Sequence, residues 1–196
     1  MRIISGKYKG RRINPPKNLP VRPTTDMSKE SLFNILNNRF DFEGLKVLDL
    51  FSGTGNLSYE FGSRGAESIT SVDADFGCIK YIKQTAAEFD FNITAIKGDV
   101  YKFLQEHKAS YDIIVADPPY NSAQKEFESV VTYVFDNNLL QEEGMMIIEH
   151  SKHTTLEHMM NWSFSKKYGG SMFSFFEFDK DESEEDINEN PDVEEL

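Results

Sequence analysis

The chain has 196 residues, of which 39% are hydrophobic and 28% charged, and its formal net charge is −12. This length is typical of one domain that folds without covalent staples, and the single cysteine, Cys78, excludes an internal disulfide. No apolar run approaches the roughly 20 residues of a membrane helix, and the amino terminus lacks the apolar centre of a signal peptide. We therefore expect a cytoplasmic protein with one folded domain.

The charge is distributed unevenly along the chain. Residues 1–40 hold nine basic and two acidic residues, for a net charge of +7, whereas residues 177–196 hold eleven acidic residues and one lysine, for a net charge of −10. An acidic surface repels the phosphates of nucleic acids, but a basic segment attracts them locally. The whole-chain charge therefore does not exclude an RNA partner.

The first 25 residues are rich in proline, arginine and lysine. Their four prolines prevent a continuous helix, although Arg2 to Arg12 can form a short hairpin with Gly6 or Gly10 at its bends. The cations of this segment predict a phosphate-tracking arm: Lys7, Lys9, Arg11, Arg12 and Arg22. From Asp26 to Asn38 apolar residues recur at helical spacing, which predicts an amphipathic helix.

After Gly44, short apolar strands alternate with amphipathic helices. Strands are predicted at Lys46–Leu50, Ser68–Asp73, Asn92–Ile96, Tyr111–Asp117 and Met145–His150, and helices at Asn56–Arg64, Phe76–Phe89, Val100–His107 and Lys125–Asn137. Repeated strand–helix–strand units require right-handed crossovers, so this pattern predicts an α/β domain whose parallel sheet has helices on both faces.

The end of the predicted domain differs from its beginning. Trp162–Tyr168 and Ser171–Phe178 alternate apolar and polar residues around Gly169-Gly170, which is a strong hairpin signal. A mostly parallel seven-stranded sheet that ends in an antiparallel hairpin is typical of Rossmann-like class I methyltransferases. Residues 26–178 are thus the predicted catalytic domain, and residues 179–196 form an acidic tail that is expected to be disordered.

The first predicted strand runs into Asp49-Leu-Phe-Ser-Gly-Thr-Gly55, a loop in which Gly53 and Gly55 permit a sharp turn beside a ligand. A Walker loop would need Lys-Ser/Thr where Asn56-Leu57 stands, and a dinucleotide fingerprint would need Gly or Ala at Ser58. Asp49 would repel a pyrophosphate. It suits a ligand with a cationic amino group, and S-adenosylmethionine is such a ligand.

Acidic residues end three successive predicted strands, at Asp49, Asp73 and Asp99. Asp73 can accept hydrogen bonds from both ribose hydroxyls of the cofactor, and Asp99 with the backbone of Val100 can read the adenine edge. Each acid alone is equally well explained as a helix N-cap. The three acids together with the glycine pair favour a cofactor site, which we predict to comprise Asp49, Phe51, Ser52, Gly53, Gly55, Asp73, Ala74, Asp99, Val100 and Asp117.

The stretch Ile113 to Tyr120 carries the predicted chemistry. Pro118-Pro119 ends a buried strand and holds Asp117 rigidly at its carboxyl end. The lone pair of an exocyclic amine on a nucleobase is delocalised into the ring, and hydrogen bonds to a carboxylate and a backbone carbonyl localise it. Asp117 and the Pro118 carbonyl can accept those bonds, and Tyr120 can stack on an extruded base. The predicted catalytic residues are therefore Asp117, Pro118, Pro119 and Tyr120.

The chain resembles the bacterial 16S rRNA guanine-N2 methyltransferase family (RsmD-like) over residues 1–178. The matching stretches are Met1 to Arg12, Arg22-Pro-Thr-Thr-Asp26, Lys29 to Leu36, Val47 to Gly55, Ser63-Arg-Gly-Ala66 and Asp117-Pro-Pro-Tyr120. The resemblance implies methyl transfer from S-adenosylmethionine to N2 of a guanine in small-subunit rRNA, and an RNA-contact role for the basic segment at residues 1–25. The stretch Asp26-Met-Ser-Lys29 departs from a more basic pattern in the family, and the acidic tail lies outside that pattern.

Two other functions stay open on sequence grounds. Asp-Pro-Pro-Tyr also suits an adenine-N6 methyltransferase acting on DNA or RNA, and a non-catalytic RNA-binding assembly factor could use the same fold.

We expect no metal, because His150, His153 and His158 have no cysteine partners and match no common spacing. A monomer suits docking on a ribosomal particle. The tail is either a solubilising appendage or an RNA mimic that competes for the basic arm.

Overall fold

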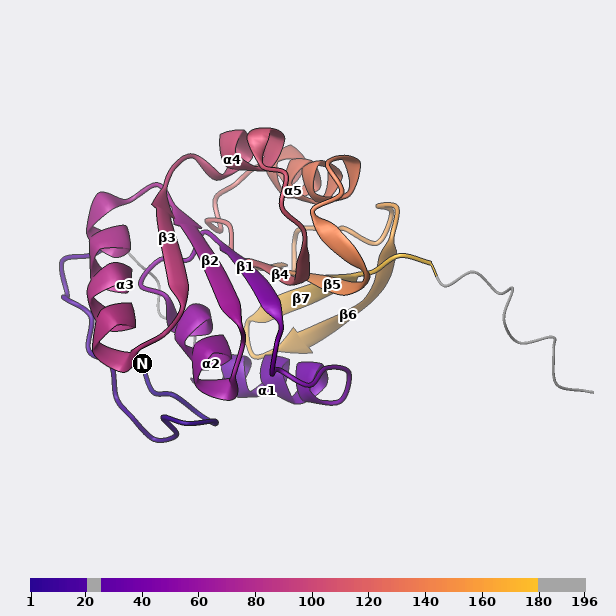
Figure 1. The fold of residues 1–196 in the computed structure, drawn as a ribbon. Helices are drawn as coiled ribbons and strands as arrows, with labels where there is room; N and C mark the ends of the chain where they lie inside the picture. The colour runs from indigo at the N-terminus through magenta and orange to yellow at the C-terminus, as the bar shows by residue number, and fades with distance from the viewer. Residues whose placement is uncertain (21–25, 180–196) are drawn as a thin grey trace, which may run out of the picture.

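The computed structural model describes residues 1–20 and 26–179 and contains five helices and seven strands (Figure 1). In chain order the elements are α1 (Asp26–Asn37), β1 (Lys46–Leu50), α2 (Asn56–Arg64), β2 (Ser68–Asp73), α3 (Phe76–Phe89), β3 (Ile93–Lys97), α4 (Val100–Glu106), β4 (Tyr111–Ala116), α5 (Gln124–Asp136), β5 (Leu140–Ser151), β6 (Trp162–Tyr168) and β7 (Ser171–Phe176). The predicted order of helices and strands is confirmed. Residues 180–196 of the acidic tail and the predicted RNA contact Arg22 lie outside the described residues.

The strands form one sheet in the order β3-β2-β1-β4-β5-β7-β6. Strands β1 to β5 pair in parallel, and β7 lies antiparallel between β5 and β6. The turn between β6 and β7 is Gly169-Gly170, with Gly169 at φ 58°, in the left-handed region that favours glycine. This is the predicted mostly parallel α/β sheet, ending in the predicted antiparallel hairpin.

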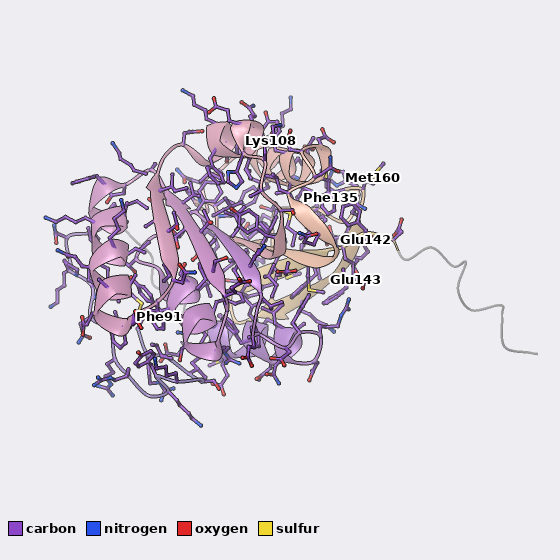
Figure 2. The ribbon with its side chains drawn as sticks, in the orientation of Figure 1. Phe91, Lys108, Phe135, Glu142, Glu143 and Met160 are labelled. Atoms are coloured by element: carbon purple, nitrogen blue, oxygen red, sulfur yellow. The ribbon has the colours of Figure 1, made fainter. Side chains whose placement is uncertain are left out.

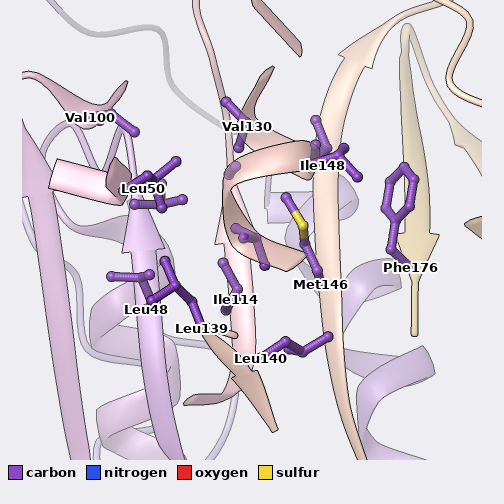
Figure 3. Packing of buried hydrophobic residues seen from close by; sticks show 14 of the residues in the cluster. Leu48, Leu50, Val100, Ile114, Val130, Leu139, Leu140, Met146, Ile148 and Phe176 are labelled. Carbon is purple, nitrogen blue, oxygen red and sulfur yellow. The ribbon is translucent and has the colours of Figure 1, made fainter. Parts of the chain in front are cut away.

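Helices cover both faces of the sheet (Figure 1). On one face α4 and α5 pack on Leu48, Ile114 and Met146, and Figure 3 shows these side chains level with one another across neighbouring strands. On the other face α1 and α2 pack on the alternate residues of the same strands, such as Val47 and Ile113. Because both faces are buried, the central strands are almost wholly apolar, which explains why they were readable from sequence.

Strand β5 is longer than predicted. It begins at Leu140 rather than Met145, and its register with β4 shifts between Tyr111 and Ile113. A Cβ at Gly144 would lie 2.8 Å from the Asp112 carbonyl oxygen, so the irregularity needs a glycine. The residues just before Gly144, including Glu142 and Glu143 (Figure 2), are exposed and polar. They lack the apolar pattern of a strand, so the sequence did not predict this half of β5.

The amino-terminal segment is packed against the domain. Arg2 and Arg12 form an antiparallel bridge, which confirms the predicted hairpin, and both Gly6 and Gly10 have positive φ. Ile3 and Ile13 are buried with residues of α2 and α3. A Cβ at Gly6 would lie only 1.8 Å from the Ser63 carbonyl oxygen, so the segment touches α2 backbone to backbone. Within the described residues, no helix has the length and apolarity needed to cross a membrane.

Candidate active site

A cavity of about 1100 Å³ opens at the carboxyl ends of β1, β2, β3 and β4. It brings together residues that are far apart in sequence: the loop after β1, the acids after β2 and β3, and the loop after β4. Of the predicted cofactor and catalytic residues, those on its wall are Phe51, Ser52, Gly53, Asp73, Ala74, Asp99, Val100, Asp117, Pro118, Pro119 and Tyr120. The fold thus brings most of the predicted cofactor and catalytic residues to one cavity.

Backbone hydrogen bonds hold the loop after β1 in place. The Ser52 N–H donates to the Val72 carbonyl at 3.1 Å, and the Gly53 N–H donates to the Asp73 carboxylate at 2.8 Å. Phe51 has φ 58° although it is not glycine, a conformation that costs free energy and is concentrated at functional sites. The Ser52 hydroxyl is buried on the cavity wall and has no hydrogen-bond partner among the described residues.

The two acids that follow β2 and β3 differ in their local roles. Asp73 accepts from the N–H groups of Gly53 and Asp75, each at 2.8 Å, so it links the loops after β1 and β2. Asp99 caps α4 by accepting from the Lys102 N–H at 2.9 Å while it also lines the cavity. The N-cap alternative therefore holds for Asp99 but not for Asp73, and the cap of α3 is Asp75 instead.

Asp49 and Gly55 are predicted cofactor residues that the structure does not place on the cavity wall. Asp49 is 3% exposed, and its carboxylate accepts from the Ser58 hydroxyl, which also contacts Ser71. Burial raises the pKa of Asp49 to about 7, against the opposing effect of the hydrogen bonds from Ser58. Asp49 thus lies beneath the loop after β1 because its side chain points along the α2 face of β1.

Gly55 serves packing. It precedes α2 with φ 82°, and a Cβ there would lie 2.8 Å from the ring of Tyr59. The glycine at this position is explained by its backbone conformation and by close approach of the helix's own tyrosine, without reference to a ligand.

Asp117 begins the loop after β4. Its N–H donates to the Leu50 carbonyl at 3.3 Å, which holds it at the end of β1 beside the loop that follows that strand. Pro118 is buried and Pro119 is exposed. The hydroxyl of Tyr120 donates to Glu149 at 3.2 Å and shares a hydrogen bond of 2.6 Å with the Ser171 hydroxyl. These two contacts anchor the tyrosine to β5 and β7, and no sequence pattern indicated them.

The amino-terminal segment forms another part of the wall, contributing Arg2, Arg12, Asn14, Pro15 and Pro20. Lys7, Lys9, Arg11 and Arg12 are exposed, as a phosphate-contacting surface requires. Arg2 pairs with Asp26 at 3.5 Å and is thereby partly neutralised. The basic segment and the cavity are therefore continuous rather than separate parts of the molecule.

A buried charge network fixes this segment, and sequence reasoning missed it. Glu60 is fully buried and accepts from the N–H groups of Ile4 and Ser5 and from Arg64. Its other neighbour is Lys29, 1% exposed, which also donates to the Arg2 carbonyl at 2.7 Å. Lys29 counts toward the +7 of residues 1–40, yet it is buried and cannot contact RNA. The only sequence signal was a glutamate on the apolar face of a predicted helix.

Two of the histidines and the cysteine considered in the sequence are buried in the domain or paired with a neighbouring side chain. His150 is buried and its ring nitrogens contact the Ser174 hydroxyl and the Ser151 carbonyl, while His158 pairs with Glu128. Cys78 is buried in α3 and borders the cavity, and burial raises its thiol pKa to about 12. Among residues 1–20 and 26–179, no three His, Cys, Asp or Glu side chains gather as metal ligands would.

The chain is similar to known proteins over most of its length. YlbH of Bacillus subtilis is 34% identical over 161 residues, covering 80% of this chain and 85% of that protein. Ribosomal RNA small subunit methyltransferase D of Escherichia coli K12 is 29% identical over 169 residues, covering 85% and 83%. The solved structure of yhhF from Escherichia coli superposes with a TM-score of 0.77 at 28% identity, covering 90% of this chain and 96% of that one. The family model described as Conserved hypothetical protein 95 matches residues 1–177, and the chain belongs to that family.

Proposed function

We propose that this protein transfers a methyl group from S-adenosylmethionine to the exocyclic N2 amine of a guanine in 16S rRNA. The observation that carries the proposal is one cavity lined by the acid-ended cofactor loop, by Asp-Pro-Pro-Tyr and by a basic segment. Relatives named ribosomal RNA small subunit methyltransferase D support an rRNA substrate. The choice of guanine N2 rests on the family resemblance and on the chemistry of Asp117.

The residues present fit S-adenosylmethionine. Asp73 and Asp99 can accept hydrogen bonds from the ribose hydroxyls and the adenine amine, and the buried Ser52 hydroxyl offers a polar group to the amino-acid end. Among the described residues, five aspartates and two arginines line the cavity, a balance that favours a cationic ligand. When bound, this cofactor supplies an electrophilic methyl group on a sulfonium.

The residues of the chain itself orient the guanine amine and make its nitrogen more nucleophilic. Asp117 and the Pro118 carbonyl accept its two N–H bonds, which localises the nitrogen lone pair and aims it into the cavity. Pro118 and Pro119 have fixed φ angles and the Asp117 N–H is held by Leu50, so the acceptors are positioned before the base arrives. Tyr120 offers a ring on which the extruded base stacks, and stacking contributes about 1–3 kcal/mol toward the cost of extrusion.

The test is product identification. Labelled S-adenosylmethionine is incubated with unmethylated small subunits, with naked rRNA and with DNA, and the nucleosides are then separated by mass spectrometry. We expect N2-methylguanosine in rRNA. N6-methyladenosine would establish the adenine alternative, and no product on any substrate would support the non-catalytic assembly factor.

Replacing Asp117 by alanine tests the mechanism. We expect the methylation rate to fall at least about 100-fold while the affinity for S-adenosylmethionine is unchanged, because the lost hydrogen bonds act on the amine. Glu142→Ala is a matched control, since Glu142 is an exposed carboxylate in the first half of β5 (Figure 2). Normal turnover in Asp117→Ala would remove this residue from the catalytic role.

A further inference from the structure

The antiparallel hairpin has a direct contact with the loop that follows β4. Tyr120 reaches from that loop to Glu149 on β5 and to Ser171 at the start of β7. Since Tyr120 donates to Glu149, Ser171 is left as the donor to the tyrosine oxygen, which gives an ordered chain of two hydrogen bonds. One side chain is thus fixed by two strands that lie 29 and 51 residues away in sequence.

The position of Glu149 follows from the sheet register. The last registered pair of β4 and β5 is Ala116 with Ile148, so Glu149 stands beside Asp117 one step further along. Across β5 and β7, Glu149 is opposite Phe173 and Ser151 is opposite Ser171. The fold therefore brings a carboxylate and a hydroxyl from the hairpin to the edge of the sheet where the catalytic loop begins.

Burial of the Glu149 carboxylate at this position costs free energy of folding. Glu149 directly follows the apolar run Met145 to Ile148. It is 7% exposed, and its Oε2 atom has no hydrogen-bond partner among the described residues. A buried carboxylate with incomplete hydrogen bonding lowers stability, and an apolar side chain of the same shape would be equally or more stable. The contact that Glu149 does make is with Tyr120, so its contribution is to the loop rather than to the core.

We propose that Glu149 and Ser171 are positioning residues that hold the Tyr120 ring at the angle needed to receive the target base. This proposal rests on the proposed function, in which Tyr120 stacks on the base whose amine meets Asp117. A tyrosine without the two anchors would sample other rotamers, and the base would reach the acceptors at Asp117 and Pro118 less often. The antiparallel hairpin then contributes to catalysis as well as closing the sheet.

The anchors can be removed one atom group at a time. Tyr120→Phe keeps the ring and removes the hydroxyl, Glu149→Met removes the acceptor at similar volume, and Glu149→Gln keeps an acceptor oxygen. We expect kcat to fall roughly tenfold in Tyr120→Phe and in Glu149→Met, with KM for RNA and affinity for S-adenosylmethionine unchanged. Glu149→Gln should keep most of the activity, and Glu142→Met is the control at an exposed glutamate of the same strand.

The double variant Tyr120→Phe/Glu149→Met gives the decisive comparison. If the carboxylate acts through the tyrosine hydroxyl, the double variant is no slower than either single one. Urea unfolding of Glu149→Met should give a free energy equal to or above that of the wild type, which separates positioning from a structural role. Full activity in Glu149→Met, additive losses in the double variant, or an equal loss in Glu149→Gln would each overturn the proposal.

A binding measurement keeps the test independent of turnover. A single-stranded RNA carrying one 2-aminopurine, whose amine is placed like that of guanine, loses fluorescence when its base stacks. We expect quenching by the wild type and by Glu149→Gln, and weaker quenching by Tyr120→Phe and Glu149→Met at equal RNA occupancy. Equal quenching by all four proteins would refute the positioning role. A wild type that quenches but yields no methylguanosine would refute the proposed function instead.

Discussion

The raised pKa of the buried Asp49 carboxyl predicts how the stability of the protein changes with pH. This carboxylate is 3% exposed beneath the cofactor loop, and burial raises its pKa from 3.8 to about 7. Between these two values the native protein holds a proton that the unfolded chain has released. The contribution of the Asp49 proton to the free energy of unfolding is therefore at its maximum below pH 3.8. It falls as the pH rises and is lost once the pH passes about 7.

The substitution Asp49→Asn removes the titration and keeps the shape and an acceptor for Ser58. One pKa unit corresponds to about 1.4 kcal/mol, and integration of the proton linkage between pH 5.5 and 8.5 gives about 2 kcal/mol. The wild type should lose about that much more stability than Asp49→Asn over this interval. All other titrating groups are shared by the two proteins, so they cancel in the difference.

The assay is urea unfolding of both proteins without added cofactor at several pH values in this range. Asp41→Asn, which changes an exposed carboxylate, is the control and should follow the wild type. Parallel pH profiles for the wild type and Asp49→Asn would refute the argument that burial favours the protonated form. A wild type that gained stability relative to Asp49→Asn with rising pH would show that hydrogen bonds from Ser58 outweigh desolvation.

Two further predictions concern the amino-terminal segment. Glu60→Ala should lower the free energy of unfolding by about 3–5 kcal/mol in urea, because it leaves the buried Lys29 ammonium without its carboxylate, and adding Lys29→Met should recover part of that loss. A loss below about 1 kcal/mol would contradict the buried pair. Replacing exposed Lys7 and Lys9 by alanine should weaken RNA binding and reduce the slope of log affinity against log salt by roughly 0.7–0.9 per phosphate contact, measured by filter binding. Lys108→Ala, on the exposed α4–β4 connection (Figure 2), is the control, and an equal effect there would mean that the segment is not a specific contact.

Local sequence patterns determined the architecture. The alternation of short apolar runs with helical spacing predicted the helices and every strand except β5 within a few residues, because hydrophobic periodicity is a property of consecutive residues. The first half of β5 was missed because its exposed polar side chains and the irregularity at Gly144 break that periodicity. The loops after β1 and β4 were also readable, because glycine and proline constrain the backbone at their own positions.

Tertiary contacts decided which of those residues meet. Asp49 was expected at the cofactor, yet its side chain points to Ser58 beneath the loop, an orientation set by the packing of α2 on β1. Lys29 counted toward the positive charge of residues 1–40, but the fold buries it against Glu60, 31 residues later in the sequence. Tyr120 was recognisable from its motif, whereas its anchors Glu149 and Ser171 come from the distant hairpin. Such partners are chosen by strand order and register, which no short stretch of sequence specifies.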